Sequence, residues 1–290
     1  MADYIILTDS CADLPMNIYE ALNIEVVPLS FLLEGKTYKN HPDQSSMKFS
    51  EVYGKLRDGA NISTSAVNVE EFRTAYLPHL QAGKDILYLG FSSGLSGTCN
   101  AGAIAAKELM EEYPDRTITV VDTLCAALGQ GLLVYLTAKE QAEGATLAEA
   151  AAYAEELKPR LVHWFTVDDL FFLKRGGRLS GATALVGSAL GIKPVLHVDD
   201  EGHLIKVSTV RGRKNSLKEL ANKMAETAID PQNQTIFIAH GDCLDDAKYL
   251  ADCIKEGCGY KDVIIDYVGP VIGAHSGPGT IALFYLGTHR

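Results

Sequence analysis

The chain has 290 residues, 47% of them hydrophobic, and its formal net charge is -11 at pH 7. This length allows one large domain or two ordinary ones, and either arrangement can bury a substantial core. The acidic balance argues against general nucleic-acid binding, so we expect no nucleic-acid partner.

The cysteines and histidines do not indicate a metal site. Six cysteines are scattered along the chain without a C-x-x-C pair, and eight histidines include no H-E-x-x-H spacing. We therefore expect no zinc, no cofactor and a reduced protein. The chain shows neither a signal peptide nor an apolar run long enough to span a bilayer, so we expect a cytoplasmic location without stable membrane insertion.

Short apolar runs alternate with helical patterns through the first half of the chain. The predicted strands cover residues 4–7, 24–29, 86–91 and 117–121, with a small hairpin at 31–40. The predicted helices start near Pro15 and cover residues 47–56, 69–80, 101–109, 129–143 and 146–157. This alternation predicts a parallel sheet with helices on both faces. We assign it to an N-terminal α/β domain of residues 1–165.

The pattern changes after a predicted strand at 161–167. Two neighbouring strands, 192–198 and 203–210, are expected to form a hairpin. The other predicted elements are helices at 182–190, 217–229 and 245–255, and strands at 235–239 and 263–267. Neighbouring strands are typical of α+β folds, so residues 166–290 are predicted to form a C-terminal α+β domain with a partly antiparallel sheet.

A hydroxyl-rich and glycine-rich stretch, residues 92–98, separates the predicted strand 86–91 from the helix 101–109. Free backbone N–H groups, the positive end of a helix dipole and several hydroxyl donors would meet there. This combination predicts a site for a small anion such as a carboxylate. Two alternatives remain open: the serines only cap the helix, or residues 90–94 form the G-x-S-x-G nucleophile elbow of a hydrolase.

Three further stretches carry candidate polar groups. The Thr-Asp-Ser run at 8–10 follows the first predicted strand, where ligands bind in open α/β sheets, or it satisfies loop backbone. A second hydroxyl cluster, residues 61–66, either caps the following helix or shares the anion of the first loop. His275 lies in a loop-like run, residues 268–280, whose glycines and prolines indicate a positioned imidazole as readily as a structural one.

Basic residues gather beside glycine turns in the second half of the chain. Residues 171–198 include four basic side chains and no acidic one, and residues 203–218 include five basic side chains and no acidic one. This pattern indicates either a solvated face or a patch that meets phosphate or an acidic partner.

Six motifs, each weak alone but present in the same order, resemble the DegV family along nearly the whole chain. They are Thr-Asp-Ser at 8–10 with Asp-Leu at 13–14, Ser-Thr-Ser at 63–65, Ser-Ser-Gly-Leu-Ser-Gly-Thr at 92–98, Val-Asp-Thr at 121–123, Leu-Lys-Arg-Gly-Gly-Arg at 173–178 and Gly-Pro-Val-Ile-Gly-Ala-His-Ser-Gly-Pro-Gly-Thr at 269–280. The resemblance implies a two-domain α/β protein without catalytic activity of its own. It also implies that a long-chain fatty acid binds in a tunnel between the domains.

The resemblance also implies roles for single residues. The implied ligands of the carboxylate are the hydroxyls of Thr64 and Ser93, with Ser92, Ser65 and Ser96 as close alternatives. His275 would lie near the head group. One departure is Ala66-Val67, where many relatives carry Gln-Pro; it bears on the shape of that loop and not on its hydroxyls.

Some members of the family serve as the fatty-acid-binding subunit of bacterial fatty acid kinase. They present the carboxylate to a separate ATP-binding subunit, which makes the acyl phosphate. Arg178 and Arg211 match the basic positions that, by this resemblance, would meet the partner or the phosphate.

Two other functions fit parts of the sequence. A serine hydrolase would use Ser92 with His275 and a late acid such as Asp266, although no upstream His-Gly-Gly stretch supplies an oxyanion hole. A carbonyl-sugar binder would let His275 attack a small ketone and would need a small polar pocket.

Overall fold

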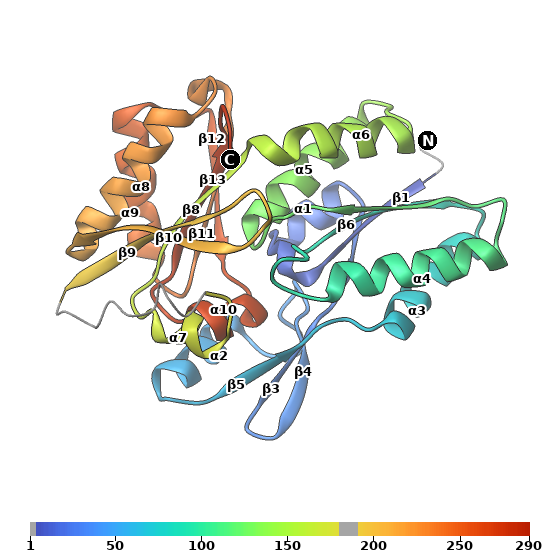
Figure 1. Cartoon of the computed structure of the whole chain (residues 1–290), viewed down its shortest axis with the longest axis horizontal. Helices are drawn as coiled ribbons and strands as arrows, with labels where there is room; N and C mark the ends of the chain where they lie inside the picture. The colour runs from blue at the N-terminus through green and yellow to red at the C-terminus, as the bar shows by residue number, and fades with distance from the viewer. Residues whose placement is uncertain (1–3, 180–190) are drawn as a thin grey trace.

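A computed structural model describes residues 4–179 and 191–290 of the chain. Figure 1 shows two large sheets, each with its own helices, and a smaller three-stranded sheet. In the N-terminal part, four parallel strands lie in the order β2-β1-β6-β7. Their bounds are Tyr4–Asp9 for β1, Ile24–Val27 for β2, Asp85–Gly90 for β6 and Ile118–Asp122 for β7.

Both faces of this parallel sheet are covered. Ile6 and Leu87 pack on one face against α5 and α6, whereas Ile5 and Tyr88 pack on the other face against α3 and α4. Burial on both faces explains why these strands read as continuous apolar runs in the sequence. The helices are α1 (Met16–Ala21), α3 (Val69–Gln81), α4 (Thr98–Glu112), α5 (Leu128–Ala142) and α6 (Leu147–Leu157).

The second large sheet has six strands in the order β10-β9-β8-β13-β11-β12. Only β11 and β12 pair in parallel; the other neighbours are antiparallel. Helices α8 (Arg213–Thr227) and α9 (Leu244–Gly257) cover one of its faces. The strands are β8 (Leu161–Thr166), β9 (Ile192–Val198), β10 (Leu204–Arg211), β11 (Thr235–His240), β12 (Asp262–Tyr267) and β13 (Ile281–Leu286).

Helix α5 lies between the two large sheets, as Figure 1 shows. Its buried leucines share one core cluster with Leu89 of β6 and with Phe237 and Phe284 of the second sheet. Glycines let this helix approach its neighbours, because a Cβ atom at Gly129 would lie 2.7 Å from the Phe284 ring. The helix therefore packs both sheets into one body.

A third, antiparallel sheet orders its strands β4-β3-β5 and packs on α2 and α10. The β3–β4 turn has positive φ at Glu34 and Gly35, as a two-residue hairpin requires. Its elements are β3 (Ser30–Leu33), β4 (Lys36–Lys39), β5 (Ile62–Ser65), α2 (Phe49–Arg57) and α10 (Pro270–Ser276). The remaining helix is α7 (Phe171–Arg175), and 3-10 turns cover Ser10–Ala12, Lys158–Arg160 and Pro231–Asn233.

The predicted fold class, a parallel α/β part followed by a part with a mixed sheet, is confirmed. The change of sheet falls between β7 and β8, because β8 pairs with β9 and β13. The division into domains of residues 1–165 and 166–290 stays a prediction. Among the described residues, no helix combines the length and the apolar character needed to cross a membrane.

The structure excludes one alternative that the sequence left open, and one local expectation was wrong. Residues 61–66 do not cap α3, because they contain strand β5, and Asn68 caps that helix in a capping box with Glu71. Residues 268–280 are not one loop, because α10 begins at Pro270, where a proline costs no intrahelical hydrogen bond. The helix expected at 182–190 lies outside the described residues.

Candidate functional site

A cavity of about 170 Å³ lies between segments of both large sheets. A buried water needs roughly 10–15 Å³ on this measure, so the space is far larger than a packing defect. Most of its wall is apolar and includes Leu29, Phe91, Phe165, Leu173, Val271 and Phe284. The cavity therefore suits a ligand with a large apolar part.

Polar side chains from four separate segments line the same cavity. The Oγ1 atom of Thr64, on β5, lies 2.8 Å from Nε2 of His275, on the last turn of α10. Arg178 also lines the cavity, and its Nε donates a 3.4 Å hydrogen bond to the carbonyl of Leu95, next to Ser96. We call the set Thr64, Ser65, Ser96, Arg178 and His275 the head-group cluster.

His275 is neutral at physiological pH. Burial, with the nearby cations of Arg178 and Arg175, lowers the pKa of its imidazole to about 4. The ring packs tightly against α7, because a Cβ atom at Gly176 would lie 2.2 Å from Nδ1. Glycine at this position therefore leaves the space that the imidazole occupies.

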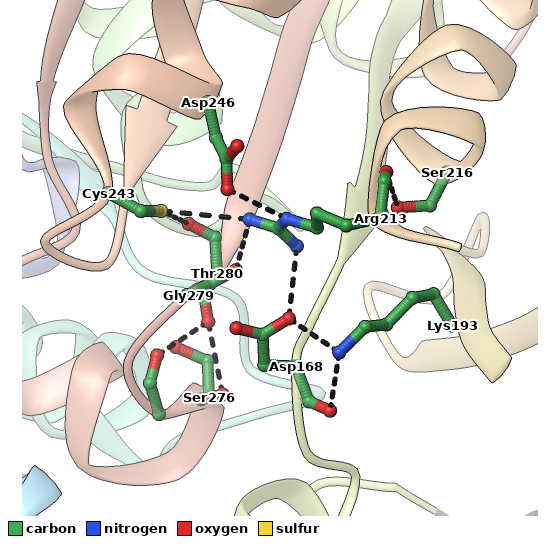
Figure 2. Close-up of polar contacts among 10 residues, drawn as sticks. Asp168, Lys193, Arg213, Ser216, Cys243, Asp246, Ser276, Gly279 and Thr280 are labelled. Atoms are coloured by element: carbon green, nitrogen blue, oxygen red, sulfur yellow. Dashed lines mark hydrogen bonds and ion pairs between the residues drawn. The ribbon is translucent and has the colours of Figure 1, made fainter. Parts of the chain in front are cut away.

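A partly exposed ionic network holds the chain that follows His275, as Figure 2 shows. Arg213 donates from Nη2 to the carbonyl of Gly279 at 2.6 Å and from Nε to Asp246 at 2.8 Å. Asp168 lies beside this arginine at 3.6 Å and accepts a 2.7 Å hydrogen bond from Lys193. No local sequence pattern predicts this network, because its members are far apart in the chain.

Thr280 closes the same segment onto α10. Its hydroxyl lies 3.0 Å from the carbonyl of Ser276 and 2.8 Å from the carbonyl of Gly277, and both carbonyls accept from it. Gly277 and Gly279 have φ angles of 81° and 79°, which non-glycine residues rarely adopt. These glycines therefore allow the backbone to turn sharply where α10 ends, directly after His275 and Ser276.

Asp9 anchors the loop after β6 and does not line the cavity. Its carboxylate accepts from the Phe91 N–H at 2.8 Å, from the Tyr88 hydroxyl at 2.8 Å and from the Cys11 N–H at 3.0 Å. Burial raises the pKa of this carboxyl, and the hydrogen bonds act against that effect. Of the two alternatives for residues 8–10, the structure favours the one in which Asp9 satisfies loop backbone.

Ser92 and Ser93 are not among the residues that line the cavity. Ser92 is fully buried, and its hydroxyl donates to the carbonyl of Gly202 at 2.9 Å. Ser93 is exposed, and its backbone N–H donates to Asp122 at 3.2 Å. The structure thus brings Ser96 of this loop, in place of Ser92 or Ser93, to the cavity.

The two arginines with an expected role toward a partner lie in different settings. Arg178 is half-buried in the cavity wall, whereas Arg211 is exposed at the end of β10. A cation is therefore part of the head-group cluster, beside the hydroxyls of Thr64, Ser65 and Ser96.

The structure gives no support to the hydrolase or ketone-binding hypotheses. In the described chain, the Ser92 hydroxyl bonds to Gly202, and His275 bonds to Thr64, so these two side chains do not form the hydrogen bond of a triad. Asp266 accepts from the Tyr267 N–H at 2.7 Å. The mostly apolar cavity is not the small polar pocket that a ketone binder needs. Over residues 4–179 and 191–290, no three His, Cys, Asp or Glu side chains converge as metal ligands.

Comparisons with known proteins agree with this architecture. The model of the family described as "Uncharacterised protein, DegV family" matches residues 4–288. A DegV domain-containing protein of Clostridium perfringens is 46% identical over 287 residues, which cover 99% of this chain and 98% of the relative. Among solved structures, a DegV lipid binding protein from Thermotoga maritima has a TM-score of 0.87 at 30% identity, with 100% of both chains covered.

A second solved structure, which concerns fatty acid binding of a DegV family protein from Thermus thermophilus, has a TM-score of 0.86 at 31% identity. The match covers 98% of this chain and 99% of that chain. Both the family match and the identity to relatives extend over nearly the full length. The chain therefore belongs to the DegV family.

Proposed function

We propose that this protein binds a long-chain fatty acid, with the carboxylate at the head-group cluster and the acyl chain along the apolar walls of the cavity. The observation that carries the proposal is the Thr64–His275 pair, 2.8 Å apart, in the wall of an otherwise mostly apolar cavity. The solved relatives described as lipid binding and fatty acid binding support it.

The chemistry of the pair suits a carboxylate. A carboxylate oxygen can only accept, so the Thr64 hydroxyl must turn its proton toward the ligand. Nε2 of His275 then donates to the threonine oxygen, which fixes the imidazole as the Nε2–H tautomer. Hydrogen bonds to a charged group contribute roughly 1.5–3 kcal/mol each, and the Arg178 cation adds attraction for the anion.

Most of the affinity would come from the acyl chain. Each buried CH₂ group contributes about 0.8 kcal/mol, so a long chain exceeds the contribution of the head group several-fold. Rings of Phe91, Phe165 and Phe284 provide the apolar surface for this contact. If the acyl chain supplies most of the affinity and the carboxylate needs only a few donors, a site with few polar side chains and a large apolar wall is expected.

We further propose that the protein has no chemistry of its own and presents the bound carboxylate to a separate ATP-binding kinase subunit. Arg178 lines the cavity and is partly exposed, and Arg211 is exposed, so both are available to a partner or to a transferred phosphate. Mixing the loaded protein with such a kinase subunit and ATP should yield acyl phosphate, detected as hydroxamate. Formation of the product at the same rate without this protein would refute the presenting role.

Native mass spectrometry of the protein as purified tests lipid binding directly. We expect a mass increment that disappears on denaturation and matches a fatty acid in the organic extract. Delipidated protein should then take up palmitate or oleate at a ratio of one to one. An extract without lipid, together with no uptake of either acid, would refute the proposal.

A further inference from the structure

A second, much smaller cavity of about 20 Å³ lies where the loop after β1 meets the loop after β4 and the end of β12. None of its lining residues lines the larger cavity. The oxygen-bearing side chains around it are Ser10, Asp13, Tyr19, Asn40, Gln44 and Asp266. On the measure used above, the space holds one or two water-sized species.

Two buried acceptors at this cavity have no partner among the described residues. Asn40 is 2% exposed and donates from Nδ2 to the carbonyl of Ser10 at 3.2 Å, which fixes the orientation of its amide. Its Oδ1 atom and the Oδ2 atom of Asp13 remain without a hydrogen bond. Buried acceptors are nearly always paired, so two of them at one cavity indicate a missing species that they bind.

The cavity also has two carboxyl groups and no matching basic side chain among the described residues that line it. Asp13 and Asp266 both line it, and none of the described lining residues is Lys, Arg or His. Ionised carboxylates are costly in such a place unless a cation or a proton compensates them.

We propose that this cavity is a binding site for a hard divalent cation of the Ca²⁺ or Mg²⁺ class, with carboxylate oxygens of Asp13 and Asp266 and the amide oxygen of Asn40 as protein ligands. Oxygen ligands without nitrogen or sulfur select this class of metal. Bidentate carboxylates, one water and the oxygens of Ser10, Tyr19 and Gln44 around the cavity are available for the remaining positions. The cation ties the first loop of the parallel sheet to the chain just before α10, the helix that carries His275.

Calorimetry and thermal unfolding of chelator-treated protein test the site. We expect CaCl₂ or MgCl₂ to bind at a ratio of one to one and to raise the midpoint of unfolding, whereas NaCl at equal ionic strength does not. Asp266→Asn and Asp13→Asn should each weaken binding at least ten-fold.

Asp262→Asn is the matched control, because Asp262 lies on the same strand and also accepts from the next backbone N–H, at 2.8 Å. Its side chain does not line the cavity, so the variant should bind the cation like the unmodified protein. The proposal is refuted if neither chloride salt binds, or if binding survives in both cavity variants. In either case the two acceptors are satisfied without a cation, by a water or by a protonated Asp13 carboxyl that donates to Oδ1 of Asn40.

Discussion

Replacing Thr64 by valine removes one hydroxyl from the head-group cluster and keeps the shape of the side chain. The expected result is weaker fatty acid binding, because the carboxylate loses its hydroxyl donor and Nε2 of His275 loses its 2.8 Å partner. The loss of a hydrogen bond to a charged group, roughly 1.5–3 kcal/mol, corresponds to about 10- to 150-fold in the dissociation constant.

The same change should leave the fatty-acid-free protein nearly as stable as before. Thr64 is only half-buried, and its hydrogen bond to a neutral imidazole contributes about 1 kcal/mol to folding. For a chain of this size that corresponds to a fall of a few degrees, about 2–4 °C, in the midpoint of thermal unfolding. The Thr64→Val change should therefore weaken fatty acid binding strongly and lower the stability of the protein only slightly.

Thr37→Val is the matched control for this prediction. Thr37 lies exposed on β4 of the same small sheet and does not line the cavity, so this variant should bind like the unmodified protein. Calorimetric titration of delipidated protein with palmitate measures the dissociation constants of both variants and of the unmodified protein. Equal affinity of Thr64→Val and the unmodified protein, within a factor of two, would show that the carboxylate is not bound by this pair.

Three further variants test Ser96 and Arg178 of the cluster and Ser93 outside it. Ser96→Ala should weaken palmitate binding about ten-fold and Ser93→Ala less than two-fold, because only Ser96 lines the cavity; the reverse order in titration would restore Ser93 as the ligand. Arg178→Met should raise the pKa of His275 above about 4, since the arginine cation lowers it, and NMR titration measures this shift.

The folded-state pKa of His275 lies below that of the unfolded chain, so its stabilising contribution is present above pH 6.5 and is lost as the pH falls through about 4. Unfolding of fatty-acid-free protein in urea at pH 7 and pH 4 should therefore show about 3 kcal/mol less acid destabilisation in His275→Gln. Equal acid sensitivity of the two proteins would contradict the lowered pKa.

Local sequence patterns sufficed for most elements of the fold. Apolar runs such as 86–91 are long enough to mark strands, and the Glu34-Gly35 turn identifies its hairpin through backbone preference alone. Helix α10 was missed, because Gly269 before it, Gly273 within it and the following Gly-Pro-Gly resemble a loop when read one residue at a time. Tertiary packing of Ala274 against the small sheet overrides that weak helical preference.

The site was harder to predict than the fold, because the direction of a side chain depends on packing between distant segments. The serines of residues 92–98 look equivalent in sequence, yet Ser92 bonds to the β9–β10 turn and only Ser96 reaches the cavity. A Cβ atom at Gly202 would lie 2.2 Å from the Ser92 hydroxyl, so that contact depends on a glycine about a hundred residues away. No local pattern contains this information.

The placement of Arg178 changes the electrostatic account of the site. The chain carries a net charge of -11, which disfavours an anionic ligand at long range. Salt screens charges beyond about 8 Å under physiological conditions, so the cations nearest to the cavity decide the local potential. Because His275 is neutral, in the proposed complex Arg178 would supply the charge for the carboxylate, and the hydroxyls of Thr64 and Ser96 would orient it. One partly exposed cation also neutralises a carboxylate less tightly than a buried ion pair would, which suits the proposed presentation of the carboxylate to a partner.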